Sequence, residues 1–287
     1  MNILEQVYAD KLTAFGFVPM NHKQPQWFPV ELQDCFTATG EKVPGYKAVV
    51  NTESRQVLHV GTSSYALVPN QDTTEKTNAA IAASRLDTTG MLYARDMSHE
   101  GRRSFQRWVL PAMSEEINGT MVALSINAWN SYDGSRAFVL RGGNLSAVCA
   151  NFAVVGKEFS RRHVGEIDVD SMALDLVQAA ETYHQQIIAM KTWPQKQITD
   201  THAIEVFEQL PGSNKRLQGE LLGNWLKAKE STGPNSGSNL WALYNTLTAW
   251  STHGDGFKEA TKAYARVNRE ERVAELIEGD SWNVLAA

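Results

Sequence analysis

The first half of the chain is dominated by short runs of apolar and β-branched residues separated by polar segments. Such runs predict β-strands, and the polar segments between them are typical of tight turns. The predicted hairpins pair residues 46–50 with 56–60, 91–97 with 104–110, and 120–127 with 137–140. Local hairpins give antiparallel strands and need no crossover helices. We therefore expect an antiparallel sheet.

Three further patterns refine this half of the chain. Asp133-Gly134 is a strong turn signal between two predicted strands. Residues 142–144, Gly-Gly-Asn, predict another turn before a strand over 145–152. A helix is expected over residues 72–84, where Asp72 can cap the first turn and Glu75 can reach back to it. We expect this helix to pack against a curved sheet.

The pattern changes to helical spacing after Gly165. Over residues 169–191, apolar side chains such as Leu176, Tyr183 and Ile187 recur close to every 3.6 residues. Further helices are predicted over 199–209, 215–230, 240–252 and 258–269, with a linker-like stretch at 231–238. The C-terminal half is thus expected to be helical.

These patterns predict an α+β fold in which three regions form one interlocked unit. Residues 1–40 are expected to form a short amphipathic helix and an irregular segment interrupted by prolines. Residues 41–165 are expected to form the antiparallel sheet core with its packed helix, and residues 166–287 a helical region packed on that core.

Composition limits the class of protein. Hydrophobic residues make up 43% and charged residues 21% of the 287 residues, which is typical of a globular chain that builds its own core. The apolar runs are too short to span a bilayer, and the N-terminus carries Glu5 where a secretion signal would be basic. We expect a cytoplasmic protein (the host cytoplasm if it is phage-encoded) with no membrane partner. Two cysteines and scattered histidines predict no disulfide framework, metal site or cofactor.

Charge is unevenly distributed on this chain, whose net charge is −5. Between residues 134 and 163, Glu158 is the one acid among several basic residues, and a group of arginines lies upstream at 95–107. A local basic face on an acidic protein is compatible with a nucleic-acid groove. It is equally compatible with a solvated sheet edge, where charge prevents unwanted strand pairing.

The most distinctive strings are Asn130-Ser-Tyr-Asp-Gly-Ser135 and Val148-Cys-Ala-Asn151. They resemble motifs of the phage- and plasmid-borne domain of unknown function 932 (DUF932), and the segments 45–49 and 240–248 also resemble that family. The sequence departs from the family pattern at its extreme C-terminus, where a Trp-Phe-Gly type of sequence is expected. The resemblance implies a role in DNA metabolism or defence evasion on mobile elements, with no activity that carries over to individual residues.

The leading functional hypothesis is single-stranded DNA binding, with annealing of complementary strands and without catalysis. Basic side chains would neutralise phosphates while aromatic rings stack on unpaired bases, which is the combination that single-strand binding needs. The alternative is that turn chemistry alone accounts for residues 130–136. The candidate nucleic-acid-binding residues are Arg95, Arg102, Arg103, Arg107, Trp108, Trp129, Tyr132, Arg136, Arg141, Lys157, Arg161 and Arg162. The predicted sheet is also similar to the cores of phage annealing proteins, which implies a homo-oligomeric ring or filament.

Two other classes of function remain open. No Walker loop or Gly-x-Ser-x-Gly elbow is present, so an enzyme would be a metal-dependent nuclease using Asp96, Glu100 and Asp133, or would use Cys149 with His163. An interaction protein that binds a host protein or a phage replication protein would use tryptophans as anchors. The candidates are Trp225, Trp241, Trp250 and Trp282, and core packing is the simpler interpretation of them.

Overall fold

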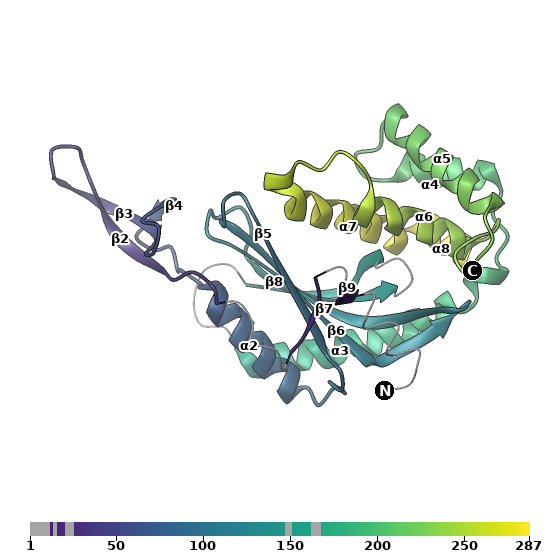
Figure 1. The fold of residues 1–287 in the computed structure, drawn as a ribbon, viewed down its shortest axis with the longest axis horizontal. Coiled ribbons are helices and arrows are strands. Elements are labelled where there is room, and N and C mark those ends of the chain that lie inside the picture. Colours follow the sequence, from purple (N-terminus) through teal and green to yellow (C-terminus); the bar gives the residue numbers. More distant parts are fainter. Residues whose placement is uncertain (1–11, 14–15, 21–25, 147–150, 162–167) are drawn as a thin grey trace.

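A computed structural model describes residues 12–13, 16–20, 26–146, 151–161 and 168–287. Its central element is a six-stranded antiparallel sheet in the order β1-β5-β6-β7-β8-β9 (Figure 1). The strands are β1 (Val18–Pro19), β5 (Leu92–Ser98), β6 (Arg103–Ile117), β7 (Thr120–Ser131), β8 (Phe138–Ser146) and β9 (Asn151–Arg161). The predicted α+β class and its antiparallel hairpins are confirmed. Residues 1–11, where the N-terminal helix was expected, lie outside the described residues.

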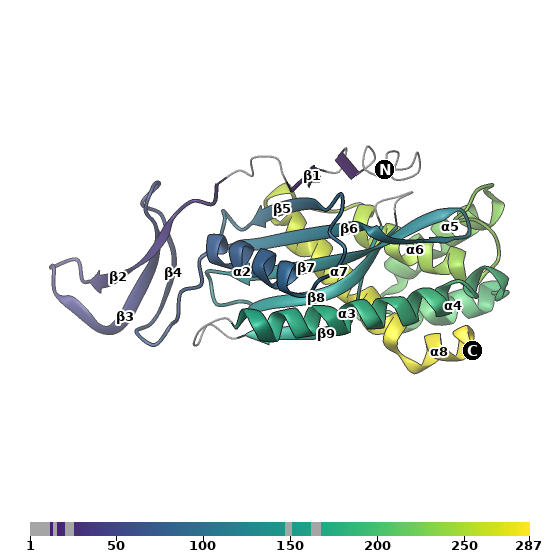
Figure 2. The ribbon, with the colours of Figure 1, turned by 90° about the horizontal axis from the view of Figure 1, so that it is seen from below.

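Side chains alternate between the two faces of this sheet, as the strand period of two requires. Trp108 and Leu110 of β6 pack on the face covered by α2 (Asn70–Ala83) and α3 (Val169–Met190). Figure 2 shows these two helices lying across that face. Phe105 and Arg107 of β6 lie on the opposite face, which is covered by α7 (Lys262–Glu278).

Two local predictions were wrong, one on strand β8 and one at the start of helix α2. Residues 142–144 do not form a turn but lie inside β8, because α3 crosses the strand closely at Gly142. A Cβ atom at Gly142 would lie 2.7 Å from the Cβ of Ala179, so a residue without a side chain fits there. Asp72 does not cap α2, which begins at Asn70 after Pro69 and has no side-chain cap.

A second, three-stranded sheet projects from one end of the molecule, and we call it the arm (Figures 1 and 2). It consists of β2 (Val30–Phe36), β3 (Lys42–Asn51) and β4 (Val57–Thr62) in antiparallel order. The predicted hairpin corresponds to β3 and β4. Strand β2 was missed because it follows a proline-interrupted segment that was expected to be irregular. Val49 and Leu58 on the inner side of the arm pack against Tyr132.

The helical C-terminal half follows the prediction closely except at its end. It contains α3, α4 (Asp200–Gln209), α5 (Lys215–Glu230), α6 (Leu240–His253), α7 and α8 (Asp280–Ala286), with short 3₁₀ turns at Trp193–Gln195 and Glu259–Thr261. Helix α7 continues to Glu278, beyond the predicted end at residue 269, and α8 was not predicted. Because α7 packs on the sheet, the helical half and the sheet share one core.

Candidate nucleic-acid interface

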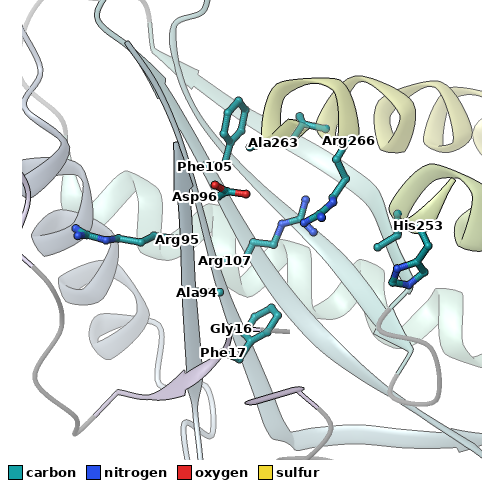
Figure 3. Close-up of a pocket in the computed structure, with 12 residues that line it drawn as sticks. Gly16, Phe17, Ala94, Arg95, Asp96, Phe105, Arg107, His253, Ala263 and Arg266 are labelled. Atoms are coloured by element: carbon teal, nitrogen blue, oxygen red, sulfur yellow. The ribbon is translucent and has the colours of Figure 1, made fainter. Parts of the chain in front are cut away.

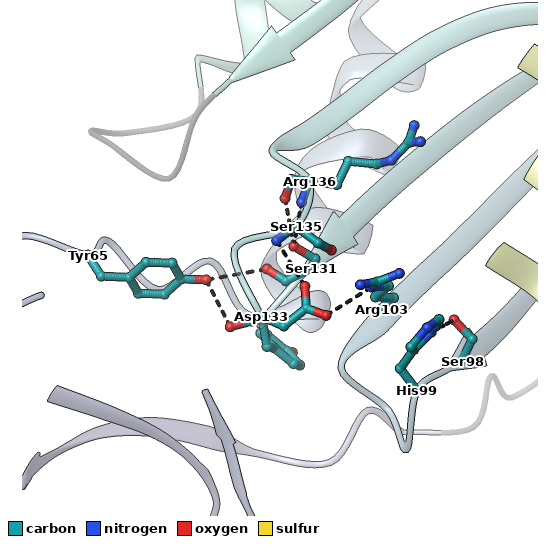
Figure 4. A network of polar contacts seen from close by, with 9 residues as sticks. Tyr65, Ser98, His99, Arg103, Ser131, Asp133, Ser135 and Arg136 are labelled. Carbon is teal, nitrogen blue, oxygen red and sulfur yellow. Dashed lines mark hydrogen bonds and ion pairs between the residues drawn. The ribbon is translucent and has the colours of Figure 1, made fainter. Parts of the chain in front are cut away.

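The β5–β6 and β7–β8 loops lie side by side at the end of the sheet nearest the arm (Figure 4). Arg103 Nε donates to Asp133 Oδ2 over 2.9 Å, and the Tyr132 backbone N–H donates to the Arg102 carbonyl over 2.7 Å. The Tyr65 hydroxyl donates to the carbonyls of Ser131 and Tyr132, each over 3.3 Å. The sequence hypothesis placed these two loops on one side of a sheet, and the structure brings them together.

Turn chemistry accounts for much of the polar loop at 131–136. Asp133 Oδ1 accepts from the Ser135 backbone N–H over 2.9 Å, and the Ser131 hydroxyl donates to the Arg136 carbonyl over 2.7 Å. Burial alone would raise the pKa of Asp133, but its bonds from Ser135 and Arg103 outweigh burial and hold the pKa below its ordinary value. Asp133 is therefore an ionised structural partner of Arg103.

The tip of the β5–β6 hairpin presents a cationic and aromatic cluster. His99 and Glu100 both adopt left-handed backbone conformations, with φ of 54° and 59°, which are uncommon for residues other than glycine. The His99 ring lies edge-on to Tyr264 of α7, with ring centroids 5.3 Å apart, and the Arg103 guanidinium lies 4.2 Å from the Tyr264 ring centroid. Burial, followed by the charge of Arg103, lowers the pKa of His99.

Tyr264 is a partly exposed aromatic side chain at this site, and sequence reasoning missed it. The surrounding residues 258–269 read as an ordinary polar helix, which gives no signal for its position against the sheet.

A small cleft lies between β5, β6, α7 and the end of α6, with a volume of about 140 Å³ (Figure 3). The guanidinium groups of Arg107 and Arg266 both point into it, from the sheet and from α7 respectively. Arg107 donates to Glu270, whose side chain is fully buried. Burial raises the pKa of Glu270 despite the neighbouring Arg107, and burial followed by the charge of Arg107 lowers the pKa of Arg266.

Hydrogen-bonding capacity is left unused on the face of the sheet beneath α7. The Oδ1 atom of Asn127, the Nε1 atom of Trp129 and the Oε1 atom of Glu270 are buried without a partner in the described part of the chain. Buried polar atoms in folded proteins are normally satisfied by protein groups or ordered water. The layer between the sheet and α7 can therefore accept water or small polar ligands.

The aromatic candidates from the sequence do not form a stacking surface. Trp108, Trp129 and Tyr132 are each no more than 1% exposed, so none can stack on a base. The Trp108 indole donates to Asn78 over 2.8 Å, and the Tyr132 hydroxyl accepts from the backbone N–H of Asn70 over 2.9 Å. These predicted roles were wrong, because both faces of the sheet are covered by helices or by the arm.

The basic candidates are dispersed. Arg95 points away from the cleft and stacks on Trp27 at 4.1 Å, whereas Arg102 pairs with Glu100 over 3.4 Å. Arg136 pairs with Glu271 of α7, and Arg141 lines a separate hollow beside the same helix. Lys157 and Arg161 lie on β9, but their side chains, and Arg162 altogether, lie outside the described residues.

The structure also places the residues of the alternative hypotheses. Glu100 and Asp133 are engaged with arginines, and no group of three metal-ligating side chains occurs among the described residues. Cys149 and His163 lie outside them. The candidate anchors of a partner protein are core residues, since the exposed fractions are 0% for Trp225 and Trp241, 3% for Trp250 and 1% for Trp282.

Comparison with known proteins gives one family. The family model described as "Domain of unknown function (DUF932)" matches residues 57–274. No significant match was found among curated proteins or among solved structures. Within the ranges that the structure describes, no helix is both long enough and apolar enough to cross a bilayer.

Proposed function

Because the chain belongs to the DUF932 family, whose description assigns no activity, we propose a function from the site itself: the protein binds single-stranded DNA along the cleft between the β5–β6 hairpin and α7. It does so without catalytic chemistry and, as an oligomer in the cytoplasm, brings complementary strands together. This keeps the function predicted from the sequence together with Arg103 and Arg107, and adds His99, Tyr264 and Arg266, which the sequence did not indicate.

The observation that carries the proposal is the line of groups from the hairpin tip into the cleft. Tyr264 contacts His99 and Arg103 and lies beside Phe105, which lines the cleft, and the guanidinium groups of Arg107 and Arg266 point into the cleft. Phosphate oxygens pair well with guanidinium groups, and every base offers a face to an aromatic ring. The volume of about 140 Å³ admits a group of the size of a phosphate, not a whole nucleotide. In the proposed mode the bases therefore stay outside, at Tyr264.

The test is fluorescence anisotropy of a labelled single-stranded oligonucleotide titrated with the Tyr264→Leu and Arg266→Gln variants. Loss of one stacking contact costs about 1–3 kcal/mol, which corresponds to a weakening of roughly 5- to 150-fold for Tyr264→Leu. Arg266→Gln should weaken binding and also flatten its salt dependence, because fewer counterions are released.

The matched control is Lys215→Gln, which removes a cation whose side chain is 92% exposed on α5, away from the cleft. It should leave both affinity and salt dependence unchanged. The proposal fails if the wild-type protein binds neither single-stranded nor duplex DNA at low salt. It also fails if the control weakens binding as much as the two cleft variants do.

A second candidate, a protein-binding role, is favoured by the outer side of the arm. Phe36, Tyr46, Val57 and Val60 are 60%, 49%, 49% and 51% exposed there, and they line one hollow. Exposed apolar patches of this kind mark interaction sites. We propose that a second copy of the chain covers this patch, since β2 and β4 are the outer strands of the arm and, among the described residues, leave edges for pairing between copies.

Sedimentation velocity tests this second candidate. The wild-type protein should sediment as an oligomer, and a Tyr46→Ser/Val60→Thr variant should shift towards the monomer while keeping its circular dichroism. A wild-type protein that stays monomeric at high concentration would contradict self-association through the arm.

A further inference from the structure

A groove of about 990 Å³ runs between α5 and α6, and His253 at the end of α6 lines both this groove and the cleft described above. Helix α5 forms one wall from Arg216 to Ala228, and α6 forms the other from Asn245 to His253. The loop at 231–236 closes one end, and Gly254 with Asp255 closes the other. The span from Arg216 to Lys227 along α5 is about 17 Å at the helical rise. The groove therefore has the volume and length of a ligand site.

The α5 wall is unusually smooth because two of its residues are glycines. Gly219 and Gly223 are one helical turn apart on the groove side, and a Cβ atom added at either would meet nothing within 4 Å. Glycine is a poor helix former, and its use inside a helix commonly reflects a need for close approach. Here nothing in the described chain makes that approach. A ligand could therefore approach the backbone of α5 closely at these two positions.

The α6 wall supplies an independent indication of a ligand. Asn245 is 4% exposed and lines the groove, and its Nδ2 donates to the Trp241 carbonyl over 2.8 Å. Its Oδ1 atom has no partner in the described part of the chain. A buried acceptor without a partner is costly, so the groove offers a hydrogen-bond site for a donor.

The charge and the donor requirement select the class of ligand. Arg216 and Lys227 are balanced by Glu220 and Asp255 around the groove, so there is no cationic excess to hold a phosphate backbone. A helical ligand uses its own backbone N–H groups internally, whereas an extended chain has N–H groups free to donate. Close approach at two glycines also suits a backbone rather than a side chain.

We propose that this groove binds a short extended segment of a partner protein, about five residues long at 3.3 Å per residue. One backbone N–H of the segment donates to Asn245 Oδ1, and its main chain runs against Gly219 and Gly223. The mixed charges at the rim select a segment with both an acidic and a basic residue. Gly219, Gly223 and Asn245, which carry this proposal, do not line the proposed DNA cleft, although His253 lines both hollows, so either proposal can fail alone.

The experiment pans the full chain against a displayed library of random twelve-residue peptides, followed by anisotropy of the enriched peptides made with a fluorescent label. The wild-type protein should enrich peptides that share a short motif. Filling the groove with Gly219→Leu/Gly223→Leu should weaken their binding by at least about tenfold. Asn245→Ala should weaken peptide binding by a smaller factor. Methylating the peptide nitrogen that donates to Asn245 should weaken binding to the wild-type protein. The same methylation should not change the affinity of the Asn245→Ala variant, because that variant has already lost the acceptor.

The matched control is Lys215→Leu, which adds a leucine to α5 outside the groove and should leave peptide affinity unchanged. Replacing helical glycines in open space should not lower the unfolding temperature, so a folding defect would be recognised by calorimetry. The proposal is overturned if panning on the wild-type protein enriches no peptide beyond those enriched by panning on the Gly219→Leu/Gly223→Leu variant. It is also overturned if that variant loses oligonucleotide binding instead, which would assign the groove to nucleic acid.

Discussion

The buried ion pair between Arg107 and Glu270 gives the sharpest quantitative prediction. The Glu270 side chain is fully buried and the Arg107 side chain is 9% exposed. Replacing Arg107 by methionine keeps the apolar stem but leaves Glu270 without its partner. Removing one member of a buried pair typically costs 3–5 kcal/mol. We expect about 3 kcal/mol at neutral pH, at the lower end, because Arg266 also attracts Glu270.

The same variant should show a characteristic dependence on pH. Burial already raises the pKa of Glu270, and losing Arg107 raises it further. A carboxyl group with a raised pKa binds a proton more tightly in the native than in the unfolded state. The native protein therefore loses stability relative to the unfolded chain as the pH rises through the raised pKa. The deficit of Arg107→Met should be smallest at acidic pH, where Glu270 is protonated, and should grow as the pH rises through the raised pKa of Glu270.

Urea denaturation at several pH values measures this deficit. Arg107→Met/Glu270→Met, which replaces the pair by apolar side chains, should recover most of the lost stability, since such replacements are often neutral or stabilising. The reasoning is refuted if Arg107→Met costs the same at all pH values. It is refuted equally if the double variant is no more stable than Arg107→Met.

Two further predictions concern packing and the arm. Gly142→Ala should destabilise the protein by about 1–3 kcal/mol in urea unfolding, because its Cβ overpacks against α3, and Ala179→Gly in the same chain should restore most of the loss. Hydrogen bonds from Lys42 and Lys47 lower the pKa of Asp34 to about 2, so its NMR titration midpoint should lie there. Asp34 stabilises the arm above its ordinary pKa, and that contribution is lost as pH falls towards 2; a midpoint near 3.8 would contradict the contacts.

The hairpins and most helices were predictable because their signals are local. The strand pairs 91–97 with 104–110 and 120–127 with 137–140 required only apolar runs and a turn between them. The stripe in α3 is equally local. The Gly142-Gly143 segment misled for the same reason: two glycines signal a turn, but Gly142 is needed because α3, which comes later in the chain, crosses the strand closely there.

The candidate site was far less predictable. Its two loops were recognised from Asp133-Gly134 and the Arg102-Arg103 pair, but the pattern of β6 could not show which of its faces α7 would cover. Trp108 looked available for stacking and is buried, whereas Tyr264 looked like part of a plain polar helix and lies at the site. A single sequence does not reveal contacts of this range.

The distance along the chain between Arg107 and Glu270 has a consequence for biosynthesis. The two residues are 163 positions apart, and at about 5–20 residues per second the ribosome needs roughly 8–30 s to make that stretch. During this interval the nascent sheet has one charged and aromatic face uncovered. Contacts of such long range also slow folding after release. The last helices therefore act as the closing step of folding, and a chain stalled before α7 would be a natural substrate for chaperones.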